Sequence, residues 1–393
     1  MNIPEILQHQ RDFFKSQKTK DVTYRIQKLK ELKRTIVSRE QDIYDALKKD
    51  FHKSEFESYM SEYGLLISEL DLVLKNLNSW SKPKRVKPSM LTFPASEYIY
   101  KEPYGVVLVI APWNYPFILA IEPLMMAIAA GNTVVVKPSE LTSNTSKLVT
   151  EIIESVFKQE HVASIEGGIS VASELLEQRW DYIFFTGSVS VGKIVAQAAA
   201  KHLTPTTLEL GGKSPCIVDN TIDIKLASRR IVWGKFFNAG QTCISPDYII
   251  AHTSVKEKLI TCLKTEIIRA YGENPKLSED YPRIINEKNT NRLVEMLDDV
   301  HVVFGGKYDI TESYIEPTII DNPSLKSKLM QDEIFGPILP VLSYQTEEGL
   351  DLVLSKLKNP LAFYIFSSSK KFINNLKHIL ILLICFSKDS FEI

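Results

Sequence analysis

The stretch VVLVIAPWNYP, residues 106–116, decides the fold class of this chain. Its first five residues are all apolar, which is typical of a strand buried on both faces of a sheet. An apolar segment at 117–130 predicts a helix, and Gly131 follows it, as a glycine commonly does where a helix ends. A valine-rich run at 133–136 predicts the next strand. Strand, helix and strand in this order predict a parallel βαβ unit.

The same alternation of strands and helices continues toward the C-terminus. Further strands are expected at 182–185, 216–218, 248–251 and 361–366, and further helices at 148–157, 191–202, 224–238 and 255–269. Short turns between alternating strands and helices favour parallel sheets. The pattern therefore predicts an α/β protein in which a second α/β pass begins after Leu210.

Length and changes of pattern predict two domains and a ribbon. A chain of 393 residues is too long for a single core. Residues up to about 80 show the apolar spacing of helices. Residues 81–88 hold two prolines and four cations, which predicts a connector, and residues 91–100 are expected to form extended ribbon. We assign 1–80 and 101–210 to a first domain, 81–100 to a bridging ribbon, and 211–393 to a second domain.

Composition excludes several classes of partner. The net charge is −1, and cations are scattered among the acidic residues, so we expect no nucleic-acid groove and no membrane-binding face. The N-terminus lacks a basic stretch followed by an apolar run, so no secretory signal is expected. The longest apolar run, 379–386, is too short to span a bilayer. The four cysteines show no disulfide or metal-ligand spacing, which predicts a cytoplasmic protein with free thiols and no metal.

Cys243 is a candidate nucleophile. In the sequence GQTC, residues 240–243, it follows a glycine that is expected to end a helix, so it lies on a loop. A thiolate that attacks a carbonyl needs this exposure. The alternative is a small buried apolar residue, which most cysteines are. The negative end of the helix dipole does not favour a thiolate, so another source of activation is required.

Glu209 and Asn114 are candidates for the remaining chemistry. Glu209 lies between two leucines at the end of a strand, in LELGGKSP at 208–215, and an apolar setting would raise its pKa toward that of a general base. The alternative is an exposed turn glutamate. Asn114 follows the strand at 106–110, with prolines on both sides, so its amide is suited to stabilise an oxyanion. The alternative is an asparagine that only forms a turn.

Two loops are candidates for nucleotide binding. The sequence FFTGSVSVG, residues 184–192, runs from a strand through a glycine turn into a helix, and free N–H groups at a helix N-terminus bind phosphate. Its spacing, G-x-x-x-x-G, is not the dinucleotide fingerprint, so the motif is weak by itself. Lys137, in VKPSE at 136–140, follows another strand, where a lysine can reach ribose or phosphate. The alternative for Lys137 is a surface lysine.

Together these motifs are specific. The set PWNYP, KPSE, FFTGS, LELGGKSP, GQTC and EIFGP, in this order and at these intervals, resembles the aldehyde dehydrogenase superfamily over roughly residues 22–370. The sequence GQTCISPDY is most similar to that of the class 3 and fatty aldehyde branch of this superfamily. The resemblance implies that Cys243 is the nucleophile, that Glu209 is the base that activates the deacylating water, and that Asn114 is the oxyanion donor.

The resemblance also implies the cofactor site. Lys137 and Glu140 match the contacts to the adenosine ribose, and Glu333 and Phe335 match those to the nicotinamide ribose. The other residues expected to bind cofactor are Thr186, Gly187, Ser188, Gly192, Leu210 and Gly211. NAD or NADP is the implied cofactor. Because Glu140 repels a 2′-phosphate while Lys137 attracts one, we expect NAD to be preferred and NADP to be tolerated.

The implied fold is a doubly wound, Rossmann-like cofactor domain, an α/β catalytic domain and a small bridging ribbon, assembled as a homodimer. The implied reaction converts an aldehyde to a carboxylate through a thiohemiacetal and a thioester. Two alternatives remain open. One is a folded nucleotide-binding relic without activity, and the other is an acyl-transfer protein that binds no nicotinamide. Glu209, Lys137 and Glu333 argue against the second.

From about Leu376 the sequence no longer resembles the family. Family members continue with a glycine-rich segment, a PFGG-type loop and a strand that pairs across the subunit interface. We interpret the difference as a frameshift or truncation. The apolar run at 379–386 has high β-propensity and favours aggregation when unpaired. We therefore expect this chain to be poorly soluble, to lack a proper dimer, and to oxidise aldehydes weakly or not at all.

Overall fold

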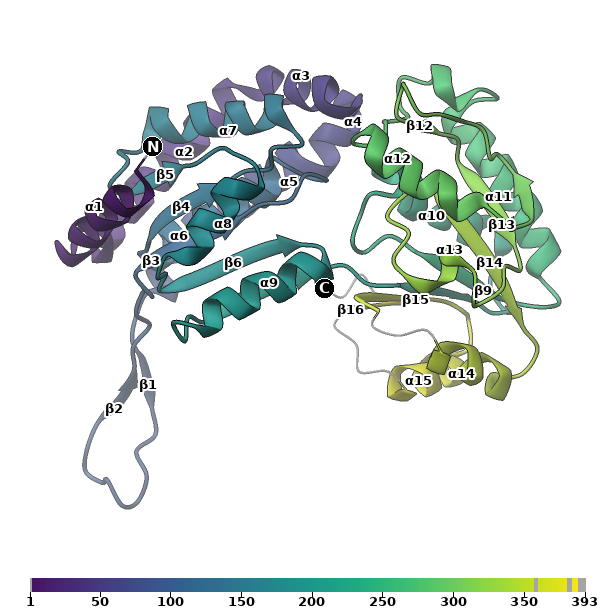
Figure 1. Cartoon of the computed structure of the whole chain (residues 1–393). Coiled ribbons are helices and arrows are strands. Elements are labelled where there is room, and N and C mark those ends of the chain that lie inside the picture. Colours follow the sequence, from purple (N-terminus) through teal and green to yellow (C-terminus); the bar gives the residue numbers. More distant parts are fainter. Residues whose placement is uncertain (1, 357–359, 380–383, 388–393) are drawn as a thin grey trace. The chain divides into compact units, whose positions relative to one another are not determined.

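A computed structural model describes residues 2–356, 360–379 and 384–387 (Figure 1). The chain forms two compact units. The first comprises Met1–Asp50 and Ser58–Glu209, and the second comprises Phe51–Glu57 and Leu210–Ile393. We had assigned all of residues 1–80 to the first domain. In the structure, Phe51–Glu57 groups with the second unit instead.

The first unit is built on a five-stranded sheet of order β5-β4-β3-β6-β7. Strands β5, β4, β3 and β6 are parallel neighbours, with Val107 opposite Val134 and Tyr182. The strands are β3 (Val106–Ile110), β4 (Thr133–Lys137), β5 (Val162–Ser164), β6 (Tyr182–Gly187) and β7 (Thr206–Leu210). All residues of β3 and β4 are buried, which confirms the prediction of strands covered on both faces.

Helices cover this sheet. Helix α2 packs against α5, α6 and α7, while α8 packs against α9. Gly131, at φ 95°, ends α6 in the left-handed conformation, as predicted from the sequence. The helices of this unit are α1 (Ile3–Lys15), α2 (Val22–Ser38), α3 (Glu40–Phe51), α5 (Gly64–Trp80), α6 (Ile118–Ala130), α7 (Ser143–Val156), α8 (Ile169–Glu177) and α9 (Val189–Ala200). The short helix α4 (Glu55–Ser58) lies mostly in the segment that groups with the second unit.

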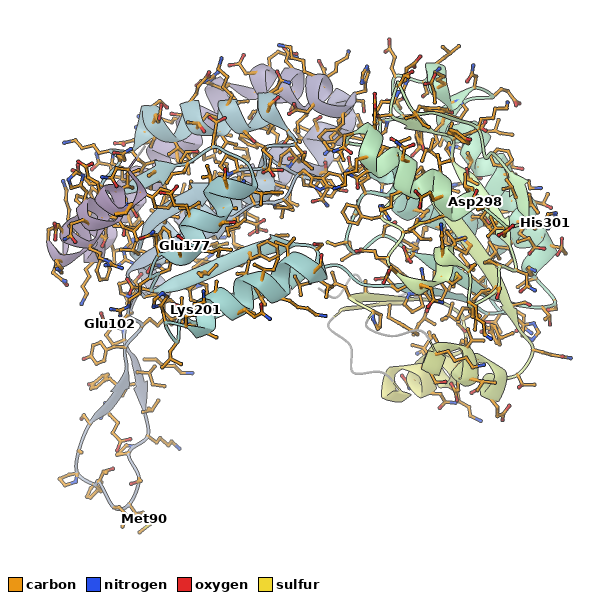
Figure 2. The ribbon with its side chains drawn as sticks, in the orientation of Figure 1. Met90, Glu102, Glu177, Lys201, Asp298 and His301 are labelled. Carbon is orange, nitrogen blue, oxygen red and sulfur yellow. The ribbon has the colours of Figure 1, made fainter. Side chains whose placement is uncertain are left out.

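An antiparallel ribbon extends away from the sheet of the first unit (Figure 1). It consists of β1 (Lys84–Val86) and β2 (Glu97–Ile99), with Arg85 opposite Tyr98. Both strands lie within residues 81–100, which we assigned to a bridging ribbon. Within that range, extended structure was expected at 91–100 and a connector at 81–88, whereas Lys84–Val86 of the connector also forms a strand. Met90, in the loop at the end of the ribbon, is 97% exposed (Figure 2).

The second unit is built on a seven-stranded sheet of order β10-β13-β14-β9-β8-β15-β16. All neighbours are parallel except β10 and β13. The strands are β8 (Pro215–Val218), β9 (Tyr248–His252), β10 (Val302–Phe304), β13 (Thr318–Asp321), β14 (Ile338–Tyr344), β15 (Ala362–Phe366) and β16 (Ile384–Ser387), and β11 (Tyr308–Asp309) pairs with β12 (Tyr314–Ile315) outside this sheet. Both α/β passes predicted from the sequence are confirmed.

Two hydrophobic clusters lie against opposite faces of this sheet. Cys216 and Val218 of β8 belong to the cluster that includes α10 and α11, whereas Ile217 belongs to the cluster that includes α14 and α15. This split follows from the alternation of side chains along a strand. The helices are α10 (Ile224–Phe236), α11 (Lys256–Tyr271), α12 (Glu287–Val294), α13 (Lys328–Gln331), α14 (Glu347–Lys356) and α15 (Lys370–Ile379).

The apolar run predicted at 379–386 lies partly outside the described residues, at 380–383. Ile379 ends α15, and 384–387 form β16. Strand β16 pairs in parallel with β15, with Cys385 opposite Phe363. The backbone of this described part is therefore paired within the sheet of its own unit. In the described part of the chain, no helix is both long and apolar enough to cross a membrane.

His161 gives the first unit a pH-sensitive stability. Its ring lies 5.4 Å from each of the rings of Phe13, Tyr24 and Phe157, and only 2% of the residue is exposed. Burial, together with the charges of Lys28 and Lys18, lowers the pKa of His161 to about 4. The folded protein therefore keeps this ring neutral where an unfolded chain, with a pKa of about 6.5, takes up a proton.

We expect protonation of His161 to lower the free energy of unfolding by about 3 kcal/mol as the pH drops from about 6.5 to about 4. Below about pH 4, where the ring is protonated in both the folded and the unfolded protein, His161 should cause no further loss of stability. The measurement is urea unfolding at pH 7 and pH 4.5 of the wild type and of His161→Phe, which keeps a ring in the cluster. The variant should be less sensitive to this pH change, while His202→Gln, at an exposed position, should match the wild type. Equal pH sensitivity of His161→Phe and the wild type would show that His161 is not responsible.

Candidate active site

Three predicted site residues lie at one edge of the first unit's sheet. Lys137 is the last residue of β4, Gly187 is the last residue of β6, and Asn114 follows the end of β3 by four residues. Strands β4, β3 and β6 are adjacent and parallel, so their carboxyl ends share this edge. Ligands of open α/β sheets bind at such an edge.

Asn114 is held in a buried loop. The residue is 4% exposed and lies between β3 and α6. Glu62 fixes the far end of this loop, because its carboxylate accepts hydrogen bonds from the backbone N–H groups of Phe117, at 2.8 Å, and Ile118, at 3.3 Å. Glu62 is fully buried in the π-helical segment Tyr59–Tyr63, and π-helical turns are frequent at functional sites. Glu62 thus fixes the backbone where the loop that carries Asn114 enters α6.

Lys137 and Glu140 form a local ion pair. The Lys137 Nζ donates to Glu140 Oε2 at 2.8 Å and to the Pro138 carbonyl at 3.1 Å. Lys137 is 3% exposed, so the alternative of a surface lysine is wrong. Burial raises the pKa of Glu140, but the hydrogen bond and charge of Lys137 outweigh this effect, and the net pKa lies below its ordinary value. The pair therefore presents a carboxylate and an ammonium group together at the end of β4.

The turn from β6 into α9 has the features of a phosphate site. Ser188 caps the 12-residue helix α9, with its Oγ accepting from the Val191 N–H at 3.4 Å. Gly192 lies in the first turn of the helix. The buried Thr186 Oγ1 has no hydrogen-bond partner within the described residues. A free hydroxyl beside a helix N-terminus fits the oxygens of a phosphate or ribose.

Glu209 is exposed, near the end of β7. The sequence predicted an apolar setting for its carboxylate, and that prediction is wrong for this structure. The reason is the alternation of side chains along a strand: Leu208 and Leu210 are partly buried on one face, and Glu209 points to the other. The carboxylate is therefore accessible to water, which a base for hydrolysis requires.

Cys243 follows a left-handed stretch of backbone. Helix α10 ends at Phe236 and not at the predicted position 238, because Asn238, Ala239 and Gly240 have φ values of 53°, 50° and 74°. A Cβ on Gly240 would lie 2.3 Å from the Gly336 carbonyl oxygen, so only glycine fits there. Cys243 is partly exposed and is not part of a disulfide.

Glu333 lies against the backbone of Gly211. A Cβ on Gly211 would be only 2.0 Å from Glu333 Oε2, so this glycine makes room for the carboxylate. Burial and the charge of Asp247 raise the pKa of Glu333 to about 7, although the Gly212 N–H and nearby cations oppose the shift. In the second unit, Glu333 therefore lies beside Gly211. The loop that carries Cys243 lies against the same segment as Glu333, because Gly240 contacts Gly336.

A buried ion pair fixes the segment that carries Glu333. The Lys213 Nζ lies 2.6 Å from Asp247 Oδ2, and both side chains are about 95% buried, with 5% and 4% exposed. Lys213 also donates to the carbonyls of Leu329, at 3.0 Å, and Asp332, at 2.9 Å. Asp247 Oδ1 accepts from the Ile334 N–H at 2.9 Å. Both residues belong to quoted motifs, LELGGKSP and GQTCISPDY, but the sequence analysis gave them no role.

Phe335 is positioned by Arg292, which the sequence analysis also missed. The Arg292 Nη2 donates to the Ile334 carbonyl at 2.8 Å and reaches the Phe335 carbonyl at 3.5 Å. Phe335 itself has a positive φ of 50°, which a phenylalanine adopts only when its surroundings impose it. No local pattern around position 292 could have predicted this contact.

The predicted residues thus form two groups. Asn114, Lys137, Glu140, Thr186, Gly187, Ser188, Gly192 and Glu209 belong to the first unit, and Leu210, Gly211, Cys243, Glu333 and Phe335 belong to the second. The geometry given above holds within each group. In the described part of the chain, no cluster of three or more His, Cys, Asp or Glu side chains could hold a metal ion.

Comparisons with known proteins agree with this architecture. Residues 1–378 match the aldehyde dehydrogenase family. The chain is 48% identical over 360 residues to 4,4'-diaponeurosporen-aldehyde dehydrogenase of Staphylococcus aureus, covering 91% of this chain and 78% of that protein. It is 42% identical over 374 residues to the dimeric NADP-preferring aldehyde dehydrogenase of Canis lupus familiaris, covering 95% and 83%.

A solved structure gives the same result. Staphylococcus aureus AldH in its substrate-bound state matches with a TM-score of 0.96 and 45% identity, over 100% of this chain and 86% of that one. The two α/β units therefore have the aldehyde dehydrogenase fold. The chain belongs to the aldehyde dehydrogenase family. It is an enzyme that oxidises aldehydes.

Proposed function

We propose that this enzyme oxidises aldehydes to carboxylates with NAD or NADP through a covalent thioester on Cys243. The observation that carries the proposal is the turn before Cys243. Its left-handed residues and the close contact between Gly240 and Gly336 hold a partly exposed thiol on a rigid loop. Such a fixed and accessible thiol suits nucleophilic attack, whereas a buried structural cysteine needs no such loop.

The first half-reaction forms the thioester. The Cys243 thiolate bonds to the aldehyde carbon, and the carbonyl oxygen becomes an alkoxide. Asn114 donates a hydrogen bond to this oxygen, which lowers the energy of the charge that develops there. NAD or NADP, when bound, would supply the hydride acceptor. When the alkoxide reforms its double bond and the hydride leaves the carbon, the acyl group remains on Cys243 as a thioester.

The second half-reaction releases the product. Glu209 removes a proton from water, and the resulting hydroxide adds to the thioester carbon. The carbon–sulfur bond then breaks, so that Cys243 leaves as a thiolate and the product leaves as a carboxylate. The exposed position of Glu209 supports this role, because the proton must pass on to solvent before the next turnover.

The described residues fit a dinucleotide. The N-terminus of α9 and the Thr186 hydroxyl suit the phosphates, and the Glu140 carboxylate suits the ribose hydroxyls. Glu333 supplies a second carboxylate for the other ribose. Because Glu140 would repel a 2′-phosphate, we propose that NAD is preferred. Lys137, paired with Glu140 at 2.8 Å, would offset part of this repulsion, so NADP is tolerated.

We predict that Glu209→Gln slows turnover about 10²- to 10⁴-fold, the usual effect of losing a positioned acid or base. The glutamine keeps the size of the side chain but cannot accept the proton of water. Acylation does not need this proton transfer, so the first burst of reduced cofactor should persist. Stopped-flow absorbance of the reduced cofactor separates the burst from the steady state. A steady-state rate equal to that of the wild type would remove Glu209 from the mechanism.

We further propose that the ribbon takes part in any dimer. Met90 and Leu91 are each 97% exposed, and Phe93 is 77% exposed, and such apolar groups at the end of a ribbon suit contact with a second subunit. The described cysteines Cys216, Cys243 and Cys262 are not part of a disulfide, which supports a reducing, cytoplasmic location. That the tail weakens the dimer and the activity stays a prediction.

A further inference from the structure

The backbone before Cys243 is strained. Asn238 and Ala239 are not glycines, yet both have positive φ values, of 53° and 50°. Residues other than glycine rarely adopt this conformation and keep it only where their surroundings impose it. Both residues are buried, with 0% and 1% exposed. The position of Cys243, four residues beyond Ala239, therefore depends on the contacts that hold this stretch.

One of these contacts comes from a distant part of the sequence. The Glu57 carboxyl group accepts a hydrogen bond from the Asn238 N–H, with its two oxygens at 3.2 and 3.4 Å from the nitrogen. Glu57 is 4% exposed and lies 181 residues before Asn238 in the chain. It thus binds the first residue of the left-handed stretch.

Gln241 holds the other end of the same stretch. Its Nε2 donates to the Asn238 carbonyl at 3.0 Å and to the Arg283 carbonyl at 3.1 Å, and its Oε1 accepts from the Ile285 N–H at 3.0 Å. Asn238 is therefore fixed at its N–H by Glu57 and at its carbonyl by Gln241. These hydrogen bonds fix the orientation of the peptide groups on both sides of Asn238, five residues before Cys243.

The segment that carries Glu57 is anchored to the second unit. The Arg283 N–H donates to the Phe51 carbonyl at 2.8 Å, and the Asn238 N–H donates to Glu57. Within the segment, the Glu57 N–H donates to Ser54 Oγ at 3.3 Å. The contacts with Arg283 and Asn238 agree with the grouping of Phe51–Glu57 with the second unit. Glu57, the last residue of this segment, therefore contacts the loop that leads to Cys243.

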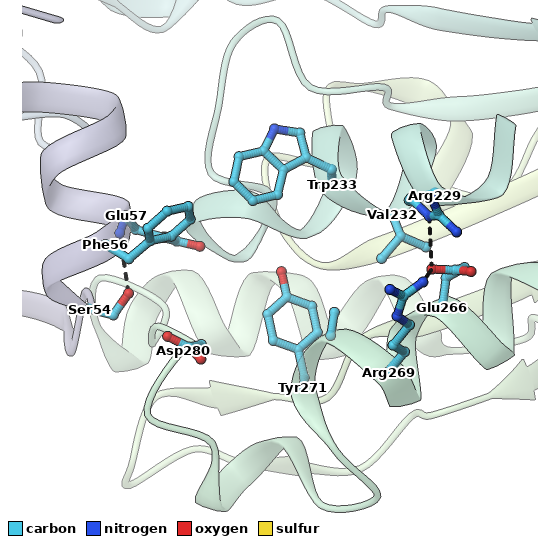
Figure 3. Close-up of a pocket in the computed structure, with 11 residues that line it drawn as sticks. Ser54, Phe56, Glu57, Arg229, Val232, Trp233, Glu266, Arg269, Tyr271 and Asp280 are labelled. Carbon is cyan, nitrogen blue, oxygen red and sulfur yellow. Dashed lines mark hydrogen bonds and ion pairs between the residues drawn. The ribbon is translucent and has the colours of Figure 1, made fainter. Parts of the chain in front are cut away.

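Glu57 also lines a cavity of about 390 Å³, together with Phe56, Trp233, Tyr271 and Asp280 (Figure 3). Burial raises the pKa of Glu57 to about 8, although Lys53 and the Asn238 N–H oppose the shift and Asp280 adds to it. The groups that face it are thus Lys53, Asp280 and the Tyr271 hydroxyl. At pH 7 the carboxyl group is largely protonated, so a neutral acceptor can serve in its place.

We propose that Glu57 is a positioning residue, which holds the loop of Cys243 in its left-handed conformation by binding the Asn238 N–H. The proposal rests on the proposed function in one respect, the role of Cys243 as nucleophile. Glu57 itself touches neither substrate nor cofactor. Its removal should therefore lower kcat and the reactivity of the Cys243 thiol, and leave the KM for cofactor unchanged.

The test compares Glu57→Ala with Glu57→Gln. Alanine leaves the buried Asn238 N–H without this acceptor, and we expect kcat and the rate of Cys243 alkylation by iodoacetamide each to fall about tenfold, the scale of one lost hydrogen bond. Glutamine keeps an acceptor oxygen, so it should restore both rates to within about twofold at pH 7, because the native group is largely neutral there. The alkylation rate is read by mass spectrometry of the peptide that contains Cys243.

Asp280→Asn is the matched control, because Asp280 lines the same cavity but is exposed. It should leave both rates unchanged. If Glu57→Ala does not fold, Glu57→Asp replaces it, since a side chain shorter by one methylene cannot reach Asn238, and it should lower both rates. The proposal is overturned if the shortened variants keep wild-type rates, or if glutamine is as slow as alanine. A failure of the proposed function looks different: turnover would survive Cys243→Ala while alkylation still responded to Glu57.

Discussion

Replacing Cys243 by alanine should abolish aldehyde oxidation and leave the binding of NAD or NADP intact. The thiol forms the only covalent bond to substrate in the proposed mechanism, and hydride cannot leave an aldehyde carbon until a nucleophile has added to it. The residues expected to hold the cofactor lie elsewhere, at the end of β4, at the N-terminus of α9 and on the segment of Glu333. A loss of at least about 10⁴-fold in kcat is expected, in line with the loss of other covalent nucleophiles.

The measurement pairs steady-state production of reduced cofactor with a fluorescence titration of cofactor binding. Cys216→Ala and Cys262→Ala are the controls. Cys216 is fully buried in the sheet, and burial raises the pKa of its thiol well above the ordinary range, so it is inert. Cys262 lies on α11. If Cys243→Ala retained aldehyde oxidation, the assignment of the nucleophile would be wrong.

Breaking the buried pair of Lys213 and Asp247 should have the largest effect on stability. Asp247→Ala leaves the Lys213 ammonium group buried, with only 5% of its side chain exposed, and removes the acceptor of the Ile334 N–H. Loss of one partner from a buried ion pair costs about 3–5 kcal/mol. We expect that decrease in the free energy of unfolding, together with weaker cofactor binding, because the segment that carries Glu333 loses its support.

Urea unfolding measures the stability, and a double variant, Lys213→Met with Asp247→Leu, provides the sharper comparison. Removing both members of the pair avoids leaving the Lys213 ammonium group buried without its partner, so the double variant should be more stable than Asp247→Ala alone. Glu102→Gln breaks the exposed pair with Lys20 and should change stability little. The account of this pair fails if Asp247→Ala unfolds at the same urea concentration as the wild type.

Much of the fold could be predicted because buried parallel strands have a strong local signal. The runs at 106–110 and 133–136 are apolar or nearly so, and both are strands buried on both faces. The ribbon was harder to predict, because short exposed strands have no apolar face, and β1 and β2 each contain only three residues. Their partners, and so their bounds, depend on contacts across the ribbon.

In the candidate site, too, residues in local motifs could be predicted, whereas residues that act through contacts between distant segments could not. Cys243, Asn114 and Glu209 could be proposed from the sequence because they lie in specific motifs. The setting of Glu209 was predicted wrongly, because its leucine neighbours point to the other face of β7. The roles of Glu57, Lys213 and Arg292 arise from contacts between distant segments, such as the one that joins positions 57 and 238, and no local pattern indicates them.

In the proposed mechanism, the acyl group of the substrate is bound covalently to Cys243 during turnover. The most direct measurement uses Glu209→Gln, in which deacylation is expected to be slow. The variant is mixed with an aldehyde and NAD, quenched in acid within the burst, digested, and analysed by mass spectrometry. We expect an acyl adduct on the peptide that contains Cys243, in an amount equal to the burst of reduced cofactor. A burst of reduced cofactor with no adduct, or with the adduct on another residue, would contradict it.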